Sequence, residues 1–124
     1  MIDFNNAVFA KLKPVHYQAF SAMLAPMLLP TEEIIGSFQG IRDGIVFTDK
    51  RIIAINVQGI TGKKKDFSSL PYSKIQAFSA ETAGVGDLDS ELELWFSGLG
   101  KVKFDFAKDV NIMEICRVIS EKVL

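Results

Sequence analysis

The sequence has little of what most catalytic and metal centres are built from. It contains one histidine, His16, and one cysteine, Cys116, so no internal disulfide can form, and a zinc site or a Ser-His-Asp triad lacks partners. A single cysteine also suits a reducing compartment. The segment Gly84-Val85-Gly86 lacks the third glycine and the following helix of a dinucleotide site. We therefore expect no enzymatic activity, no metal and no cofactor.

An excess of charge of one sign and long apolar runs are also missing. Lys and Arg number 14 against 15 Asp and Glu, a net charge of -1, whereas nucleic-acid-binding domains carry a basic excess. The most apolar stretch, residues 19–29, is about half the length of a membrane span and is interrupted by Pro26. The N-terminus lacks the basic and apolar regions of a signal peptide. These absences predict a cytoplasmic protein that binds no nucleic acid and is not integral to a membrane.

What the chain does contain is a change of hydrophobic period near Glu33. Before it, Pro14 suits the first turn of a helix and Pro26 ends one. Four apolar residues between them recur at the spacing of one helix face: Phe20, Met23, Leu24 and Met27. We therefore predict an N-terminal helical extension over residues 1–31, with the helix running from Pro14 to near Leu24.

From Glu33 onward, apolar residues alternate with a period of two, which is typical of strands. Seven segments have the length and composition of strands: 34–41, 44–48, 51–57, 65–70, 74–81, 91–97 and 101–106. Short links rich in turn residues join them, which favours antiparallel neighbours because parallel strands need long crossovers. The sequence predicts a mainly β fold, a seven-strand antiparallel meander, within a domain spanning residues 32–124.

An amphipathic helix is predicted after the last strand, with Asp109 as its N-cap and Glu114 in its early turns. One apolar stripe follows helical spacing: Ile112, Ile115, Cys116, Ile119 and Val123. That stripe has to cover something, and an open end of the β-layers is the expected place. Cys116 is accordingly predicted to fill the core, where a thiol is inert.

Seven antiparallel strands followed by one C-terminal helix is the order of the pleckstrin-homology (PH) fold. Five segments resemble, more specifically, the bacterial PH domain family, once catalogued only as a domain of unknown function: IRDGIVFTDKRII (41–53), QGITGKKK (58–65), LPYSKI (70–75), FSAETAG (78–84) and DLDSELELW (87–95). Membership would imply a partly open barrel of two near-orthogonal sheets, with the C-terminal helix plugging one end. It would also imply self-assembly into rings and no assigned enzymatic activity.

The chain departs from the eukaryotic PH pattern in two ways. Its C-terminal helix lacks the tryptophan that is typical there, and its first hairpin, residues 39–44, has Arg42 beside Asp43. Phosphoinositide-binding members carry a basic cluster at that hairpin. The second departure argues against inositol-phosphate recognition, and we expect weak or no membrane binding.

A lysine-rich hairpin is the best candidate for an anion site. Gly59 and Gly62 would let backbone N–H groups turn toward a phosphate, and the lysines that follow supply positive charge. The candidate anion-binding residues are Arg42, Lys63, Lys64 and Lys65. Successive lysines of a strand point to opposite sides, however, so they cannot all meet one ligand. The alternative interpretation is a solvated hairpin end.

Apolar residues on both faces of several strands suggest a subunit interface. If Leu94 faces the core, Trp95 faces outward, and three other residues fall on faces opposite stronger core candidates: Phe78, Ile52 and Val46. A closed monomeric barrel needs no such surplus, and Trp and Phe are enriched at interfaces. The alternative is that the N-terminal helix covers these residues.

An acidic run invites a calcium interpretation but does not support one. The run comprises Asp87, Asp89, Glu91 and Glu93, and it has neither the glycine nor the final bidentate glutamate of an EF-hand loop in register. Alternation places Glu91 and Glu93 on a solvated strand face, where they could pair with lysines of the next strand.

The function favoured by the sequence is a non-catalytic scaffold or protein-interaction module that associates with itself, as a homo-oligomer or ring. A further, unidentified protein partner is left open. The alternative is a peripheral binder of anionic lipid or phosphate that uses the lysine-rich hairpin.

Overall fold

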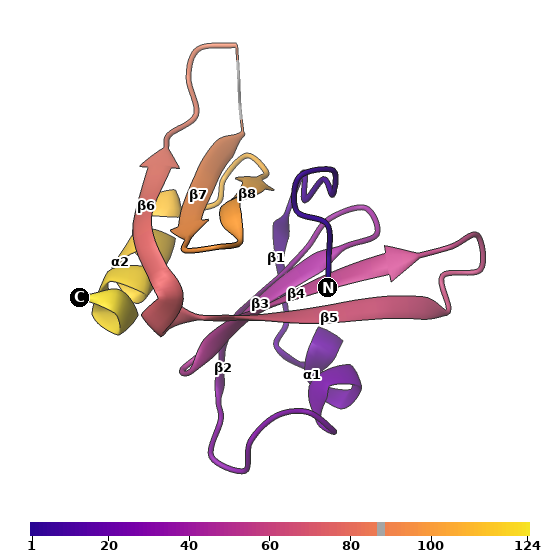
Figure 1. Cartoon of the computed structure of the whole chain (residues 1–124). Helices are drawn as coiled ribbons and strands as arrows, with labels where there is room; N and C mark the ends of the chain where they lie inside the picture. Colours follow the sequence, from indigo (N-terminus) through magenta and orange to yellow (C-terminus); the bar gives the residue numbers. More distant parts are fainter. Residues whose placement is uncertain (87–88) are drawn as a thin grey trace.

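The computed structural model of the chain describes residues 1–86 and 89–124, and its fold is mainly β. The larger sheet has the order β1-β2-β3-β4-β5, with β1 at Lys13–Val15, β2 at Ile34–Gln39, β3 at Gly44–Thr48, β4 at Arg51–Gln58 and β5 at Lys64–Pro71. The smaller sheet has the order β6-β7-β8, with β6 at Ile75–Glu81, β7 at Ser90–Phe96 and β8 at Gly100–Phe106. The helices of the described residues are α1 (Gln18–Leu24), the 3-10 helix η1 (Tyr72–Lys74) and α2 (Ile112–Val123). Figure 1 shows the chain turning at η1, so that β6 runs across the direction of β5.

The seven predicted strands are confirmed as β2 to β8, and the neighbours within each sheet are antiparallel. An additional strand, β1, lies where a helix was predicted to begin. Pro14 tolerates this position because β1 is an edge strand, where a missing N–H need not be paired. Helix α1 therefore begins at Gln18, and it ends at Leu24 as the sequence predicted.

The N-terminal residues join the two sheets along one side. The N–H of Leu12 donates to the carbonyl of Asp105 in β8 at 3.1 Å, and the N–H of Ala107 donates back to the carbonyl of Leu12 at 2.9 Å. The next residues form β1 and pair with β2. Ile2, Phe9 and Leu12 are buried in the main core. The segment predicted as an extension thus contributes directly to the packing of the strands.

The main core lies between the two sheets and α2. Its largest fully buried members come from both sheets and from the helix, and include Phe104, Phe106, Leu94 and Ile119. The apolar stripe of α2 is confirmed, since Ile112, Ile115 and Ile119 are buried and Cys116 and Val123 pack against the core. Helix α2 covers β6, η1 and β7, at an open end of the β-layers as expected.

A second, smaller core explains why β3 is buried along its whole length. Phe20 and Leu24 of α1 pack on Val46, Ile53 and Ile55, on the face of β3 and β4 that points away from the main core. The central strands are therefore covered on both sides. Their continuous apolar runs reflect this double burial rather than a surplus.

The prediction of a subunit interface is therefore wrong for two of its four residues. Val46 lies under α1, and Ile52 lies in the main core. Both have no exposed surface. The alternative that the N-terminal helix provides cover is confirmed for Val46, whereas Ile52 faces the opposite side of the sheet.

The N-cap of α2 is Asn111 and not Asp109. The Oδ1 of Asn111 accepts a hydrogen bond from the N–H of Glu114 at 3.3 Å. Asp109 lies two residues earlier with φ of 77°, in the left-handed region that asparagine and aspartate tolerate better than most residues. Asp109 belongs to the turn that leads into the helix, so the predicted N-cap lay two residues before the observed one.

A buried ion pair fastens the loop after α1 to the hairpin of β3 and β4. Glu32 has no exposed side-chain surface, and Arg51 donates to it from Nη2 at 2.8 Å and from Nε at 2.9 Å. The hydroxyl of Thr48 donates to the same carboxylate at 2.6 Å, and the N–H of Leu29 donates at 3.1 Å. Burial alone raises the pKa of Glu32, but these hydrogen bonds and the Arg51 charge outweigh it and hold the pKa below its ordinary value.

Removing the guanidinium should leave this carboxylate buried without its charge partner. We expect Arg51→Ala to lower the free energy of unfolding by about 3–5 kcal/mol, measured by urea denaturation. Lys101→Ala, which removes an exposed pair with Glu93, is the matched control and should cost less than about 1 kcal/mol. Equal losses in the two variants would contradict the role assigned to Arg51.

The lowered pKa of Glu32 also predicts how stability depends on pH. The folded state binds this proton less tightly than the unfolded state, so the contribution is complete above the ordinary pKa of about 4.5. It disappears as the pH falls through the lower pKa of the folded state. The difference in free energy of unfolding between the wild type and Glu32→Gln should be constant from about pH 7 to about pH 5 and should shrink below that. A difference that grows with acidity would refute the sign of the shift.

Candidate functional site

Two neighbouring hairpin tips form the first candidate site. Arg42, in the hairpin between β2 and β3, donates from Nη2 to the carbonyl of Gly59 in the hairpin between β4 and β5 at 2.6 Å. Asp43 accepts from the N–H of Val57 at 2.9 Å. Gly59 has φ of 76°, a left-handed conformation that suits glycine. The two tips are therefore tied together, and Arg42 lies beside the lysine-rich hairpin as the sequence grouping required.

The lysines of that hairpin do not converge on one point. Lys63, Lys64 and Lys65 are all exposed, and Lys64 and Lys65 are successive residues of β5, so they point to opposite sides of the strand. Two apolar side chains that no sequence pattern singled out lie at the same tips. Ile41 is 88% exposed and Ile60 is fully exposed. A bulky aliphatic residue inside a turn-rich, polar link is the signal that could have revealed them.

The second candidate site is the outer face of the smaller sheet, defined by Ala77, Ser79, Glu93, Trp95 and Lys101. Trp95 is 50% exposed, while Leu94 is fully buried, as the sequence predicted. The register places Trp95 opposite Ala77 on one side and Lys101 on the other. Phe78 lies opposite Leu94 and packs against the main core, so it is half-buried on the inner face rather than beside Trp95.

Charged pairs cover the rest of this outer face. Lys103 lies 3.0 Å from Glu91, and Lys101 lies 3.7 Å from Glu93, which confirms the predicted pairing across the hairpin. The hydrogen bond with Glu91 is the main reason that the pKa of Lys103 is raised. Exposed pairs of this kind contribute little to stability, so their main effect is to leave the face nearly neutral.

The remaining members of the acidic run do not gather into a metal site. Asp89 pairs with Lys11 at 2.8 Å, and Asp87 lies outside the described residues. Among residues 1–86 and 89–124, no three His, Cys, Asp or Glu side chains are grouped so that they could hold a metal ion. His16 is exposed and accepts at Nδ1 from the N–H of Gln18 at 3.3 Å. Burial raises the pKa of the Cys116 thiol, which agrees with an unreactive side chain.

A sequence model of the bacterial PH domain matches residues 3–123. The chain belongs to the bacterial PH domain family. Bacterial PH domains from Shewanella have similar folds: a DUF1696 family protein with a pleckstrin-homology domain from Shewanella loihica PV-4 is 35% identical, with a TM-score of 0.83 over 93% of this chain and 99% of the other. The pleckstrin homology domain from Shewanella amazonensis SB2B is 37% identical, with a TM-score of 0.70 over 96% of this chain and 93% of the other.

A third relative is similar in sequence. The uncharacterized protein YjqA of Bacillus subtilis (strain 168) is 52% identical over 99 residues, which are 78% of this chain and 79% of YjqA. The match to the family model and the similarity to the two Shewanella structures confirm the family resemblance predicted from the segments between residues 41 and 95. No helix among the described residues is both long enough and apolar enough to cross a membrane.

Proposed function

We propose that the protein is a non-catalytic PH-like scaffold that associates with itself through the outer face of its smaller sheet. The observation that carries this proposal is the half-exposed indole of Trp95 on a strand whose other large apolar residues are buried. Trp is one of the residue types enriched among the few that dominate the binding energy of an interface. Its position between Ala77 and Lys101 surrounds it with small and paired side chains that a second copy can approach.

The free edge of β6, the strand next to that of Trp95, supports the same proposal. Within the described residues, β6 pairs with β7 on one side only, so its other edge offers unpaired backbone groups to another strand. The outward residues of β6 near this edge are small or polar, including Ala77 and Ser79, and both are exposed. A second copy could therefore extend the sheet while covering part of Trp95. The nearly neutral charge of the face would not repel a copy of itself.

The non-catalytic part of the proposal rests on the side chains that catalysis would need. The only histidine in the sequence, His16, is exposed and accepts a hydrogen bond from the backbone N–H of Gln18. The only thiol is half-buried with a raised pKa. Among the described residues, no hydrogen bond or ion pair joins either side chain to an acid or a base that would activate it.

Placing a charge in the centre of the outer face should break the assembly. We expect Trp95→Asp to reduce the molar mass measured by light scattering to that of a smaller species, while circular dichroism keeps its wild-type form, because the indole lies outside the core. Met113→Asp is the matched control, since Met113 is also exposed but lies on α2. A wild-type protein that is monomeric, or a variant that keeps the full assembly mass, would refute the proposal.

A second candidate function, peripheral binding to an anionic lipid surface, is favoured by the hairpin tips. Ile41 and Ile60 are exposed beside Arg42 and the three lysines. Apolar side chains that enter the lipid boundary, with basic residues behind them, are the usual means by which a soluble domain adheres to an anionic bilayer. Each basic residue contributes about 1 kcal/mol near such a surface, so the attachment would be reversible.

Vesicles that contain phosphatidylserine provide the test of this second function. Changing Lys63, Lys64 and Lys65 to alanine should lower the partition coefficient about a hundredfold in a flotation assay, at about 1 kcal/mol for each lysine. Changing three exposed lysines elsewhere, Lys74, Lys108 and Lys122, alters the net charge equally and should have a much smaller effect. Serine at Ile41 and Ile60 should weaken binding to vesicles but not to free inorganic phosphate. Equal losses in both lysine variants would mean that net charge alone is responsible.

A further inference from the structure

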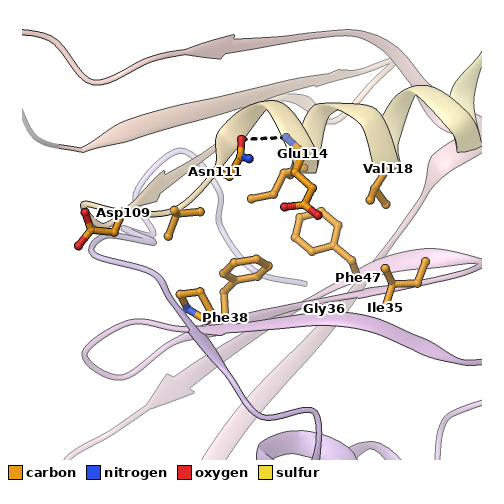
Figure 2. Close-up of a pocket in the computed structure, with 11 residues that line it drawn as sticks. Ile35, Gly36, Phe38, Phe47, Asp109, Asn111, Glu114 and Val118 are labelled. Atoms are coloured by element: carbon orange, nitrogen blue, oxygen red, sulfur yellow. Dashed lines mark hydrogen bonds between the residues drawn. The ribbon is translucent and has the colours of Figure 1, made fainter.

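A cavity of about 360 Å³ lies between the first half of α2 and the strands β2 and β3. Figure 2 shows the rings of Phe38 and Phe47 on the side of the sheet and Val118 on the side of the helix. Ile115 and Ile35 complete the apolar wall. This volume falls within the range of small-molecule sites, which are mostly apolar with a few polar groups that fix orientation.

The cavity arises from an irregularity in β2. Ile34 pairs with Thr48 and Gly36 pairs with Phe47, so Ile35 is an extra residue that bulges from the strand. Gly36 brings no side chain to the floor, and a Cβ built there would lie 3.5 Å from the Phe38 ring. Helix α2 meanwhile packs on β6, η1 and β7. The space between the other flank of the helix and β2 is left open.

The charge around this cavity has one sign. Its described lining includes two carboxylates, Asp109 and Glu114, and no Lys, Arg or His. Figure 2 shows the Glu114 carboxylate projecting from α2 over the rings of Phe38 and Phe47. In the part of the chain that the structure describes, this carboxylate has no ion-pair partner. An apolar wall with an unpaired carboxylate above aromatic rings suits a cation that carries an apolar body.

The N-terminus of α2 lies at the same end and would by itself favour an anion. One of the backbone donors left unpaired by the helix itself is already used, because the N–H of Glu114 donates to the Asn111 side chain at 3.3 Å. The N–H of Ile115 makes the first regular bond of the helix, to the Asn111 carbonyl at 3.4 Å. The carboxylates of Asp109 and Glu114 also oppose a negative ligand there. The balance of charge therefore favours a cation.

We propose that this cavity binds a small organic cation of the aryl- or alkylammonium class, with its apolar part on Phe38 and Phe47 and its ammonium group beside Glu114. This site is separate from the outer face of the smaller sheet and from the hairpin tips. Its existence does not depend on the function proposed above.

Titration of the isotopically labelled full chain with phenethylammonium, followed by nuclear magnetic resonance, tests the proposal. Amide signals of Phe47, Ile115 and Val118 should shift and saturate. The neutral analogue 2-phenylethanol should bind more weakly, and the anion phenylacetate should bind most weakly of the three. Glu114→Gln keeps the shape and the backbone N–H that the Asn111 cap requires, and it should weaken binding of the cation about three- to fivefold.

Two further variants make the test specific. Glu121→Gln removes an exposed carboxylate of α2 that does not line the cavity, and it should leave the affinity unchanged. Val118→Phe should fill the cavity and abolish binding, with circular dichroism reporting whether the fold is kept. If that variant does not fold, the comparison of Glu114→Gln with Glu121→Gln still decides. No saturable binding, equal binding of the three probes, or equal affinity in the two glutamine variants would overturn the proposal.

Discussion

Glu32 places a carboxylate inside the protein, where a charge is costly unless its partners are held in fixed positions. Arg51 meets this demand with two hydrogen bonds to the carboxylate, and it also donates to the carbonyl of Met27 and the hydroxyl of Ser69, each at 3.0 Å. One side chain thus fixes the loop after α1, the start of β4 and the end of β5. The network continues to the corner between the sheets, because the hydroxyl of Tyr72 donates to the carbonyl of Thr48 at 2.7 Å. The cover that α1 provides for the second core depends on this loop staying in place.

The N-terminal residues set the second constraint, since they use strand edges that would otherwise be open. Phe9 and Leu12 bond to β8, and β1 then pairs with β2, so one side of the β-structure is joined without a fully hydrogen-bonded barrel. Phe9 is held in addition by an edge-to-face contact with Phe104, with ring centroids 5.2 Å apart. Within the described residues, β6 keeps an edge that no other strand occupies. Free strand edges can pair with other strands, so this edge suits the self-association proposed above.

Local patterns were sufficient to predict β2 to β8 and the buried stripe of α2, because alternation and helical spacing record which face of an element meets the core. These patterns failed where a residue is covered by a segment that is distant in the sequence. Val46 and Ile52 looked like a surplus because α1 and the main core cover opposite faces of the same strands. The pairing of Glu32 with Arg51 joins residues 19 positions apart, and no spacing rule anticipates it. The cavity was equally hidden, since it depends on the bulge at Ile35 and on the angle at which α2 lies across the strands.

A filled interior restricts where this fold can bind anything. The side chains between the sheets are apolar and closely packed, and the buried network around Glu32 is occupied by its own partners. The sites proposed above accordingly use what the packing leaves incomplete: the outer face around Trp95 with the free edge of β6, two turn tips that expose Ile41 and Ile60, and the gap between the bulge in β2 and α2. These places belong to different elements of the fold. A frame of this kind can gain or lose one binding surface without disturbing the core, because the interactions that hold it together lie elsewhere.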